Sequence, residues 1–289
     1  MERHNFSYIK GAAWFVAALF IGALNDVIVQ HLSHVGLDPF TLVFFRLAIG
    51  SALLLPWIFF DKSSNSPTWI HLFRGLLTFL AVLAWIHGMS RSSVVTATLA
   101  NFTMPIVAFL LAPLFLGERP TLRLGVVLLL GFFASMITLS FSEVVVNSYL
   151  FFFIFSIVSF VLLDVLAKKY LLETSPLAII FYGNSIATLC AFLPFYYYGA
   201  LPPKQTWALL LILGIGSNLL LFSLFRAYAH SPLTLLSPLR YLEIVISIVL
   251  NYLCFSQKPT LYEWWGMAII LPVSLLVVFF SSDKRQRFR

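Results

Sequence analysis

Long apolar runs separated by short polar breaks occupy almost the whole chain. A helix needs about 20 largely apolar residues to cross the hydrocarbon core of a bilayer, and the pattern predicts ten such helices. The breaks have turn chemistry, as in Asp61–Pro67 and Gly117–Pro120, so the spans leave no room for a sizeable soluble domain. The expected spans are 11–31, 38–60, 68–88, 93–116, 121–141, 147–167, 176–198, 206–229, 233–255 and 261–281.

The composition agrees with this pattern. The chain is 61% hydrophobic and 10% charged, with a mean hydropathy of +0.96. One water-soluble core cannot bury that much apolar surface. We therefore expect an all-α integral membrane protein of ten transmembrane helices, with the lipid bilayer as its surroundings.

The net charge of +7 is explained by where the positive residues fall. If the N-terminus lies inside, most lysines and arginines lie on the cytoplasmic side, which is the positive-inside pattern. Both termini are then cytoplasmic, and the basicity requires no nucleic acid partner. The residues assigned to this side are Arg3, Lys10, Lys62, Arg74, Arg119, Arg123, Lys168, Lys169, Lys284, Arg285, Arg287 and Arg289.

A weak internal repeat relates the two halves of the chain. A shift of 139 residues brings Arg119–Leu122 over Lys258–Leu261 and Asn25 over Asp164. Each half holds five predicted spans, an odd number, so the second half enters the membrane from the opposite side. The pattern predicts two inverted five-helix repeats, residues 1–142 and 143–289, with a binding site near the midplane between them.

Arg240 and Glu243 are charged residues inside the predicted ninth span. At about 1.5 Å per residue, Glu243 lies roughly 15 Å from the start of that span, near the middle of the bilayer. A charge at that depth requires a partner, water or a ligand. Spaced i, i+3, the two residues either pair with each other or face a substrate. Tyr241 adds an aromatic ring, and Pro238 loosens the backbone nearby.

Other polar and aromatic residues in the spans complete the candidate site. The repeat brings Asn101 of the fourth span over Arg240 of the ninth. The aromatic rings of Trp85, Tyr182 and Tyr241 can stack on a planar ligand. For Asp164 we expect an ion pair with Lys168, one turn further along. The predicted substrate-binding residues are Asn25, Asp26, Trp85, Asn101, Tyr182, Arg240, Tyr241 and Glu243.

Motifs of catalysis are missing from the sequence. There is no metal-protease motif, nucleophile elbow or nucleotide-binding loop. We expect no catalytic residue, metal site or cofactor, and a membrane enzyme using His87 or Glu243 is the less favoured hypothesis. Cys190 and Cys254 fall in apolar spans and are interpreted as small apolar side chains. Transport would be driven by a gradient or by exchange.

The chain resembles the EamA type of the drug/metabolite transporter superfamily over essentially its whole length. The likeness rests on Pro105, Gly117–Glu118, Gly125, Gly131 and Pro238–Glu243. One departure is that the second half carries Ser256–Gln257 where the Gly–Glu pair would repeat. An acidic role at that loop is therefore not implied for both halves.

Within that superfamily the chain is most similar to S-adenosylmethionine uptake transporters of intracellular bacteria. The resemblance implies import of S-adenosylmethionine in exchange for S-adenosylhomocysteine, by alternating access across the bacterial inner membrane. Glu243 or Asp26 would attract the cationic groups, and Arg240 would bind the carboxylate. An amino acid, small-metabolite or drug exporter is the alternative, and the oligomeric state is left open. The matching stretches are Trp14–Phe15, Asn25–Ile28, Phe44–Arg46, Leu72–Leu76, Leu163–Asp164, Lys168–Lys169 and Pro238–Ser247.

Overall fold

The protein is built from helices throughout the part that the computed structural model describes, residues 8–58, 68–91, 100–118, 121–138, 149–170, 174–255 and 259–283. No strand occurs among these residues, which confirms the all-α prediction. In chain order the elements are α1 (Tyr8–His34), α2 (Pro39–Ile58), α3 (Thr68–Arg91), α5 (Met104–Leu116), α6 (Leu122–Thr138), α7 (Leu150–Tyr170), α8 (Pro176–Tyr198), the 3-10 turn η2 (Lys204–Thr206), α9 (Trp207–His230), α10 (Leu233–Leu236), the 3-10 turn η3 (Ser237–Tyr241), α11 (Leu242–Phe255) and α12 (Leu261–Asp283).

Seven helical segments in the described ranges are long and apolar enough to cross a membrane. Two shorter apolar helices, Met104–Leu116 and Leu122–Ile137, accompany them. The chain is therefore a multi-pass membrane protein. The count of ten spans stays a prediction, because residues 92–99 lie outside the described ranges and the two short helices do not reach full span length.

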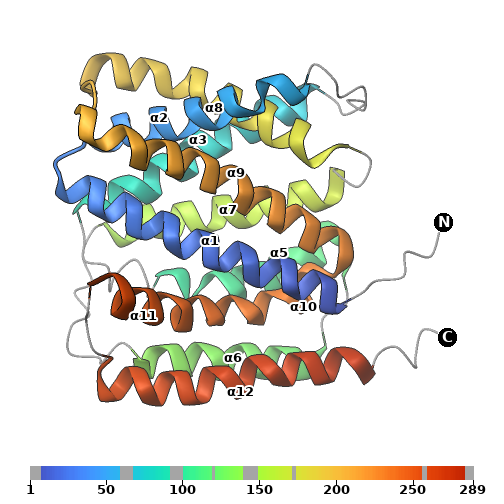
Figure 1. Ribbon diagram of the computed structural model, residues 1–289. Helices are drawn as coiled ribbons and strands as arrows, with labels where there is room; N and C mark the ends of the chain where they lie inside the picture. The colour runs from blue at the N-terminus through green and yellow to red at the C-terminus, as the bar shows by residue number, and fades with distance from the viewer. Residues whose placement is uncertain are drawn as a thin grey trace.

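The helices lie side by side in one bundle (Figure 1). The most extensive packing joins α1 to α9, α2 to α8, α3 to α7 and α6 to α12. In Figure 1, α6 and α12 form one edge of the bundle and α2 and α8 form the opposite edge. α1 begins and α12 ends at the same end of the bundle. Each of these pairs joins an early helix to a late one, so the two parts of the chain interlock.

Small residues allow some of these helices to approach closely. A side chain at Gly88 of α3 would meet the ring of Phe153 on α7 at 2.9 Å. A side chain at Gly131 of α6 would overlap the ring of Tyr241, which is buried and donates its hydroxyl proton to the Leu128 carbonyl at 3.0 Å. Close backbone approach at small residues is the usual basis of helix packing in membranes.

The predicted ninth span is interrupted at its centre. α10 ends at Leu236, the backbone continues as the 3-10 turn Ser237–Tyr241, and α11 begins at Leu242. Pro238 lies in the first turn of this 3-10 stretch and has no N–H with which to continue the α-helical ladder. The interruption places Arg240 and Tyr241 on a tighter turn inside the bundle.

Candidate binding site

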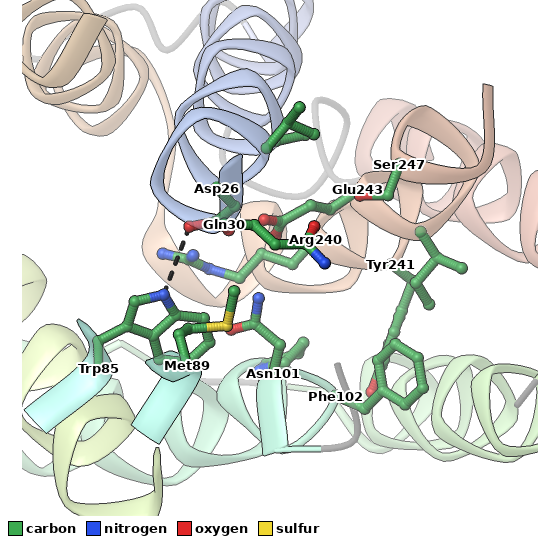
Figure 2. A pocket seen from close by; sticks show the side chains of 14 residues that line it. Asp26, Gln30, Trp85, Met89, Asn101, Phe102, Arg240, Tyr241, Glu243 and Ser247 are labelled. Carbon is green, nitrogen blue, oxygen red and sulfur yellow. Dashed lines mark hydrogen bonds between the residues drawn. The ribbon is translucent and has the colours of Figure 1, made fainter. Parts of the chain in front are cut away.

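A cavity of about 110 Å³ lies inside the bundle between α1, α3, the start of α5, η3 and α11. Figure 2 shows the residues around it. The structure brings together side chains that are far apart in the sequence, although their contact with a substrate stays a prediction. Six of the eight predicted substrate-binding residues line this cavity: Asp26, Trp85, Asn101, Arg240, Tyr241 and Glu243.

Two carboxylates enter the cavity from different helices. Asp26 of α1 accepts a hydrogen bond of 3.3 Å from Trp85 Nε1, drawn as the dashed line in Figure 2. Glu243 of α11 interacts electrostatically with Asp26 and with Arg240. Among the described residues neither carboxylate forms an ion pair. Two negative groups at one cavity with a low-dielectric wall favour a cationic ligand.

Arg46 of α2 contributes a positive charge near the same region. Its charge interacts with that of Asp26, and its Nε donates a hydrogen bond of 2.8 Å to Ser217 Oγ on α9. Arg46 is not among the residues that line the cavity. From its position behind the cavity lining, Arg46 offsets part of the Asp26 charge, and its hydrogen bond to Ser217 links α2 to α9.

Arg240 is held by groups from four other elements, α1, α5, α7 and α9. Its Nη2 donates to Asp164 Oδ2 of α7 at 2.7 Å and lies 3.4 Å from the Tyr228 hydroxyl. Nη1 lies 3.1 Å from the sulfur of Met104, and the guanidinium stands 5.4 Å from the centre of the Phe15 ring. The guanidinium is therefore fixed at the wall of the cavity.

The structure decides two questions about ion pairs that the sequence raised. Of the two alternatives for Arg240 and Glu243, the mutual ion pair is not formed, because Arg240 pairs with Asp164. The expected Asp164–Lys168 pair was wrong, because Lys168 pairs with Glu118 at 2.9 Å. α7 packs against α5, which packs against η3, and this arrangement brings the Asp164 carboxylate from another helix to Arg240.

Three further polar or polarisable residues that the sequence reading missed also line the cavity. Gln30, Met89 and Ser247 each lie four residues after a predicted residue, on α1, α3 and α11. Residues at i and i+4 share a helix face, so this spacing was the signal that could have found them. The cavity extends along these three helices towards their C-terminal ends.

Asn25 and Tyr182 lie away from the cavity. Asn25 is buried against Gly216 of α9. A side chain added at Gly216 would collide with the amide oxygen of Asn25. It follows that Asn25 faces a neighbouring helix while its neighbour Asp26 faces the cavity. The Tyr182 ring packs against His71, with ring centres 4.9 Å apart.

Glu118, Lys168 and Thr234 form a polar cluster, the Glu118 cluster, near the end of α5. Gly117 adopts a left-handed conformation with φ of 65°, ending α5 and placing Glu118 next to the start of α10. Glu118 accepts hydrogen bonds of 2.9 Å from the backbone N–H groups of Leu233 and Thr234. Burial raises the pKa of Glu118, but the Lys168 ammonium and the Thr234 hydrogen bonds outweigh burial and hold that pKa below its usual range.

A family model described as the EamA-like transporter family matches residues 9–140 and 147–279. An S-adenosylmethionine uptake transporter of Rickettsia felis is 32% identical and aligns over 98% of this chain and 96% of that protein. A counterpart of the same name in Rickettsia conorii is 31% identical over 96% of this chain and 95% of its own length.

More distant relatives carry other names. A pseudopaline exporter of Pseudomonas aeruginosa is 27% identical over 91% of this chain and 93% of its own length. A riboflavin transporter of Rhizobium johnstonii is 25% identical over 93% of this chain and 91% of its own length. A protein crystal structure with 16% identity superposes with a TM-score of 0.75 and covers 93% of this chain and 98% of its own, which shows a shared fold.

Proposed function

Because the chain belongs to the EamA-like transporter family, we propose that it imports S-adenosylmethionine across the bacterial inner membrane in exchange for S-adenosylhomocysteine. Family membership makes the chain a transporter and not an enzyme. The choice of substrate rests on the chemistry of the cavity and on the names of the Rickettsia relatives.

The observation that carries the proposal is the placement of Asp26 and Glu243 at one cavity beside Trp85. S-adenosylmethionine has a sulfonium and an ammonium cation, a carboxylate and a flat adenine. The two carboxylates supply negative charge for the cations, and an indole face attracts both a cation and a planar base. Arg240 is the cation at the cavity wall that suits the carboxylate.

The size of the cavity implies movement during transport. About 110 Å³ is well below the roughly 300 to 1,000 Å³ of typical ligand pockets. A nucleoside-sized substrate therefore requires α1 and α11 to separate from α3. The cavity extends along these helices towards the end of the bundle opposite the start of α1. If both termini are cytoplasmic, that opposite end is the outer side. This geometry suits a conformation that receives substrate from outside.

The proposed architecture is ten spans in two inverted five-helix repeats, residues 1–142 and 143–289. In the predicted order α1 and α7 open the two halves, and α3 and α9 stand third in each, so the α1–α9 and α3–α7 contacts are equivalent. α2 pairs with α8 and α6 with α12, which are the second and fifth members of each half. This exchange symmetry supports the inverted repeat, as does the family match in two segments.

The alternative is a small-metabolite exporter of the same family. It is favoured by the relatives named for riboflavin and pseudopaline, which align over more than nine-tenths of this chain. An exporter of amino acids would use the same charged residues without requiring an adenine platform.

Uptake into proteoliposomes tests the proposal. Labelled S-adenosylmethionine should enter vesicles preloaded with S-adenosylhomocysteine faster than empty ones. Excess unlabelled substrate should block the uptake, whereas methionine or adenosine alone should not. Absence of uptake under both conditions, from protein shown to be folded, would reject the proposed substrate and favour riboflavin-like or amino acid substrates as the next set.

A further inference from the structure

Arg74 of α3 is a buried cation that the transport site does not account for. Only 6% of its surface is exposed, and its Nε and Nη1 have no hydrogen-bond partner among the described residues. Its guanidinium lies 5.7 Å from the centre of the Phe225 ring. A guanidinium buried in the protein with unpaired N–H groups is costly, so an acceptor is expected in some state of the protein.

The register between α3 and α7 brings Arg74 level with Asp164. The ring centres of Trp69 and Tyr170 are 6.3 Å apart, and Ser156 Oγ donates a hydrogen bond of 2.7 Å to the Ala81 carbonyl. Residue numbers rise along α3 while they fall along α7, so the two helices are antiparallel. Arg74 and Asp164 lie between these two contacts at matching positions. Their charges interact, although Asp164 forms its ion pair with Arg240.

Asp164 thus interacts with two arginines, with Arg240 through an ion pair and with Arg74 through its charge alone. Asp164 is buried, with 7% of the residue exposed, so its carboxylate cannot exchange its partner for bulk water. Arg240 borders the cavity, and its buried Nε also lacks a described hydrogen-bond partner. Arg74 is not among the residues that line the cavity. Moving the carboxylate from Arg240 to Arg74 would satisfy the buried cation and leave Arg240 open to the cavity.

We propose that Asp164 is a counter-ion shared by two arginines, pairing with Arg240 in this conformation and with Arg74 in the alternate one. The transfer frees Arg240 to bind the carboxylate of the substrate, a step that rests on the proposed function. In that state each arginine has one carboxylate, because the substrate carboxylate replaces Asp164 on Arg240 while Asp164 neutralises Arg74. Such a carboxylate with two discrete partners is a bistable element of the kind that alternating access requires.

The first test needs no substrate. Ser247, at the cavity, is replaced by cysteine in a chain whose Cys190 and Cys254 are alanine, and its reaction with a membrane-impermeant maleimide is timed in spheroplasts. Arg74→Gln should raise the labelling rate at least 3-fold, because Asp164 can then pair only with Arg240 and the protein stays in the conformation described here. In an Asp164→Asn background the same change should alter the rate by less than 1.5-fold.

Matched variants control for non-specific effects. Arg226→Gln removes another arginine that stands over an aromatic ring, with Phe222 at 5.2 Å, but at the exposed face of α9. It should leave the labelling rate unchanged. If Arg74→Gln does not yield a monodisperse protein, Arg74→Lys replaces it; an ammonium lacks the planar fork, so the rate should rise by about 2-fold.

The second test uses transport. Arg74→Gln should slow uptake of S-adenosylmethionine and of its decarboxylated analogue, because both compounds must be carried through the alternate conformation. The slowing should be at least 5-fold greater for S-adenosylmethionine, because only its carboxylate requires Arg240 to be released. Unchanged labelling in Arg74→Gln, or a rise that persists without Asp164, would overturn the shared counter-ion. Equal slowing of both compounds would overturn the release of Arg240 to the substrate carboxylate. A wild-type protein that imports neither compound, with labelling as expected, would reject the proposed substrate and retain the counter-ion transfer.

Discussion

At the scale of single residues, the cavity depends on charges whose partners come from other helices. The sequence predicted Asp26, Trp85, Asn101, Arg240, Tyr241 and Glu243 as site residues, and all six meet at the cavity. Burial depth and helix face were enough to suggest them, since intramembrane polar groups are rare. The pairing of Arg240 with Asp164 was not predictable, because it depends on how α7 and η3 both pack against α5.

Neutralising the carboxylates tests their expected role. A charge-assisted contact contributes about 1.5 to 3 kcal/mol, so Glu243→Gln or Asp26→Asn should weaken S-adenosylmethionine binding about 10- to 100-fold. Binding is measured by scintillation proximity on purified protein. Glu263→Gln is the control, because Glu263 accepts a hydrogen bond from the Thr260 N–H at the start of α12 and has no place at the cavity. Unchanged affinity in both carboxylate variants would assign them a structural role only.

At the scale of elements, the ninth predicted span shows what periodicity alone misses. Hydropathy predicted one continuous helix from 233 to 255, whereas the structure has α10, the η3 turn and α11. Pro238 indicated a local weakness, but the five-residue 3-10 stretch follows from tertiary contacts. Ser237 Oγ donates to the Leu233 carbonyl at 2.8 Å, and Tyr241 donates to the Leu128 carbonyl of α6.

Restoring the helix at Pro238 should impair transport more than folding. Pro238→Ala returns the backbone N–H and permits a continuous α-helix, which would rotate Arg240 away from Asp164. We expect exchange to fall at least 10-fold while the size-exclusion profile is kept. Pro272→Ala is the matched control, because Pro272 also lies inside a helix, α12, but is exposed away from the cavity. Full activity in Pro238→Ala would show that the interruption is dispensable.

The Glu118 cluster predicts a pH dependence of stability. The pKa of Glu118 is lowered in the folded protein, so the ionised carboxylate stabilises the fold. This contribution to the folding free energy is complete above the usual glutamate pKa of about 4.3 and is lost as the pH falls through the folded pKa. Thermal unfolding in detergent should show a larger drop in Tm for the wild type than for Glu118→Gln between about pH 5 and pH 3.

A matched pair of lysines controls the interpretation of that experiment. Lys168→Gln should lower Tm at neutral pH, because it removes the partner of Glu118 at 2.9 Å. Lys169→Gln should not, because Lys169 is exposed and stands over the Tyr170 ring. Parallel pH profiles of wild type and Glu118→Gln would contradict the role of the cluster.

At the scale of the whole molecule, hydropathy was enough to predict an all-helical membrane protein, because the bilayer permits few other structures. The hydropathy pattern did not predict which helices pack against each other. Most of these helices are apolar on all sides, so the sequence does not distinguish a face for lipid from a face for α9 or α7. The distribution of lysine and arginine predicted the orientation, which stays a prediction.

Reporter fusions check that orientation. Fluorescent protein fused after Arg289 should fluoresce, and alkaline phosphatase fused at the same point should be inactive, if the C-terminus is cytoplasmic. Phosphatase inserted at Gly36, in the turn after α1, should be active instead. Activity at the C-terminus alone would reverse the proposed topology and the side on which the cavity receives substrate. Activity at both positions would contradict the even number of spans.

The pairing of α1 with α9 also constrains how the protein is made. α9 ends at His230, so most of the chain must leave the ribosome before α1 meets its most extensive neighbour. Until then α1 remains in the bilayer with small residues such as Gly22, which lies against Leu220 of α9 in the folded protein, facing lipid. A chain truncated after the first five helices would keep those surfaces open and become a substrate for membrane quality-control proteases. Co-expression with the missing segment should rescue it, since the two fragments complete each other's packing.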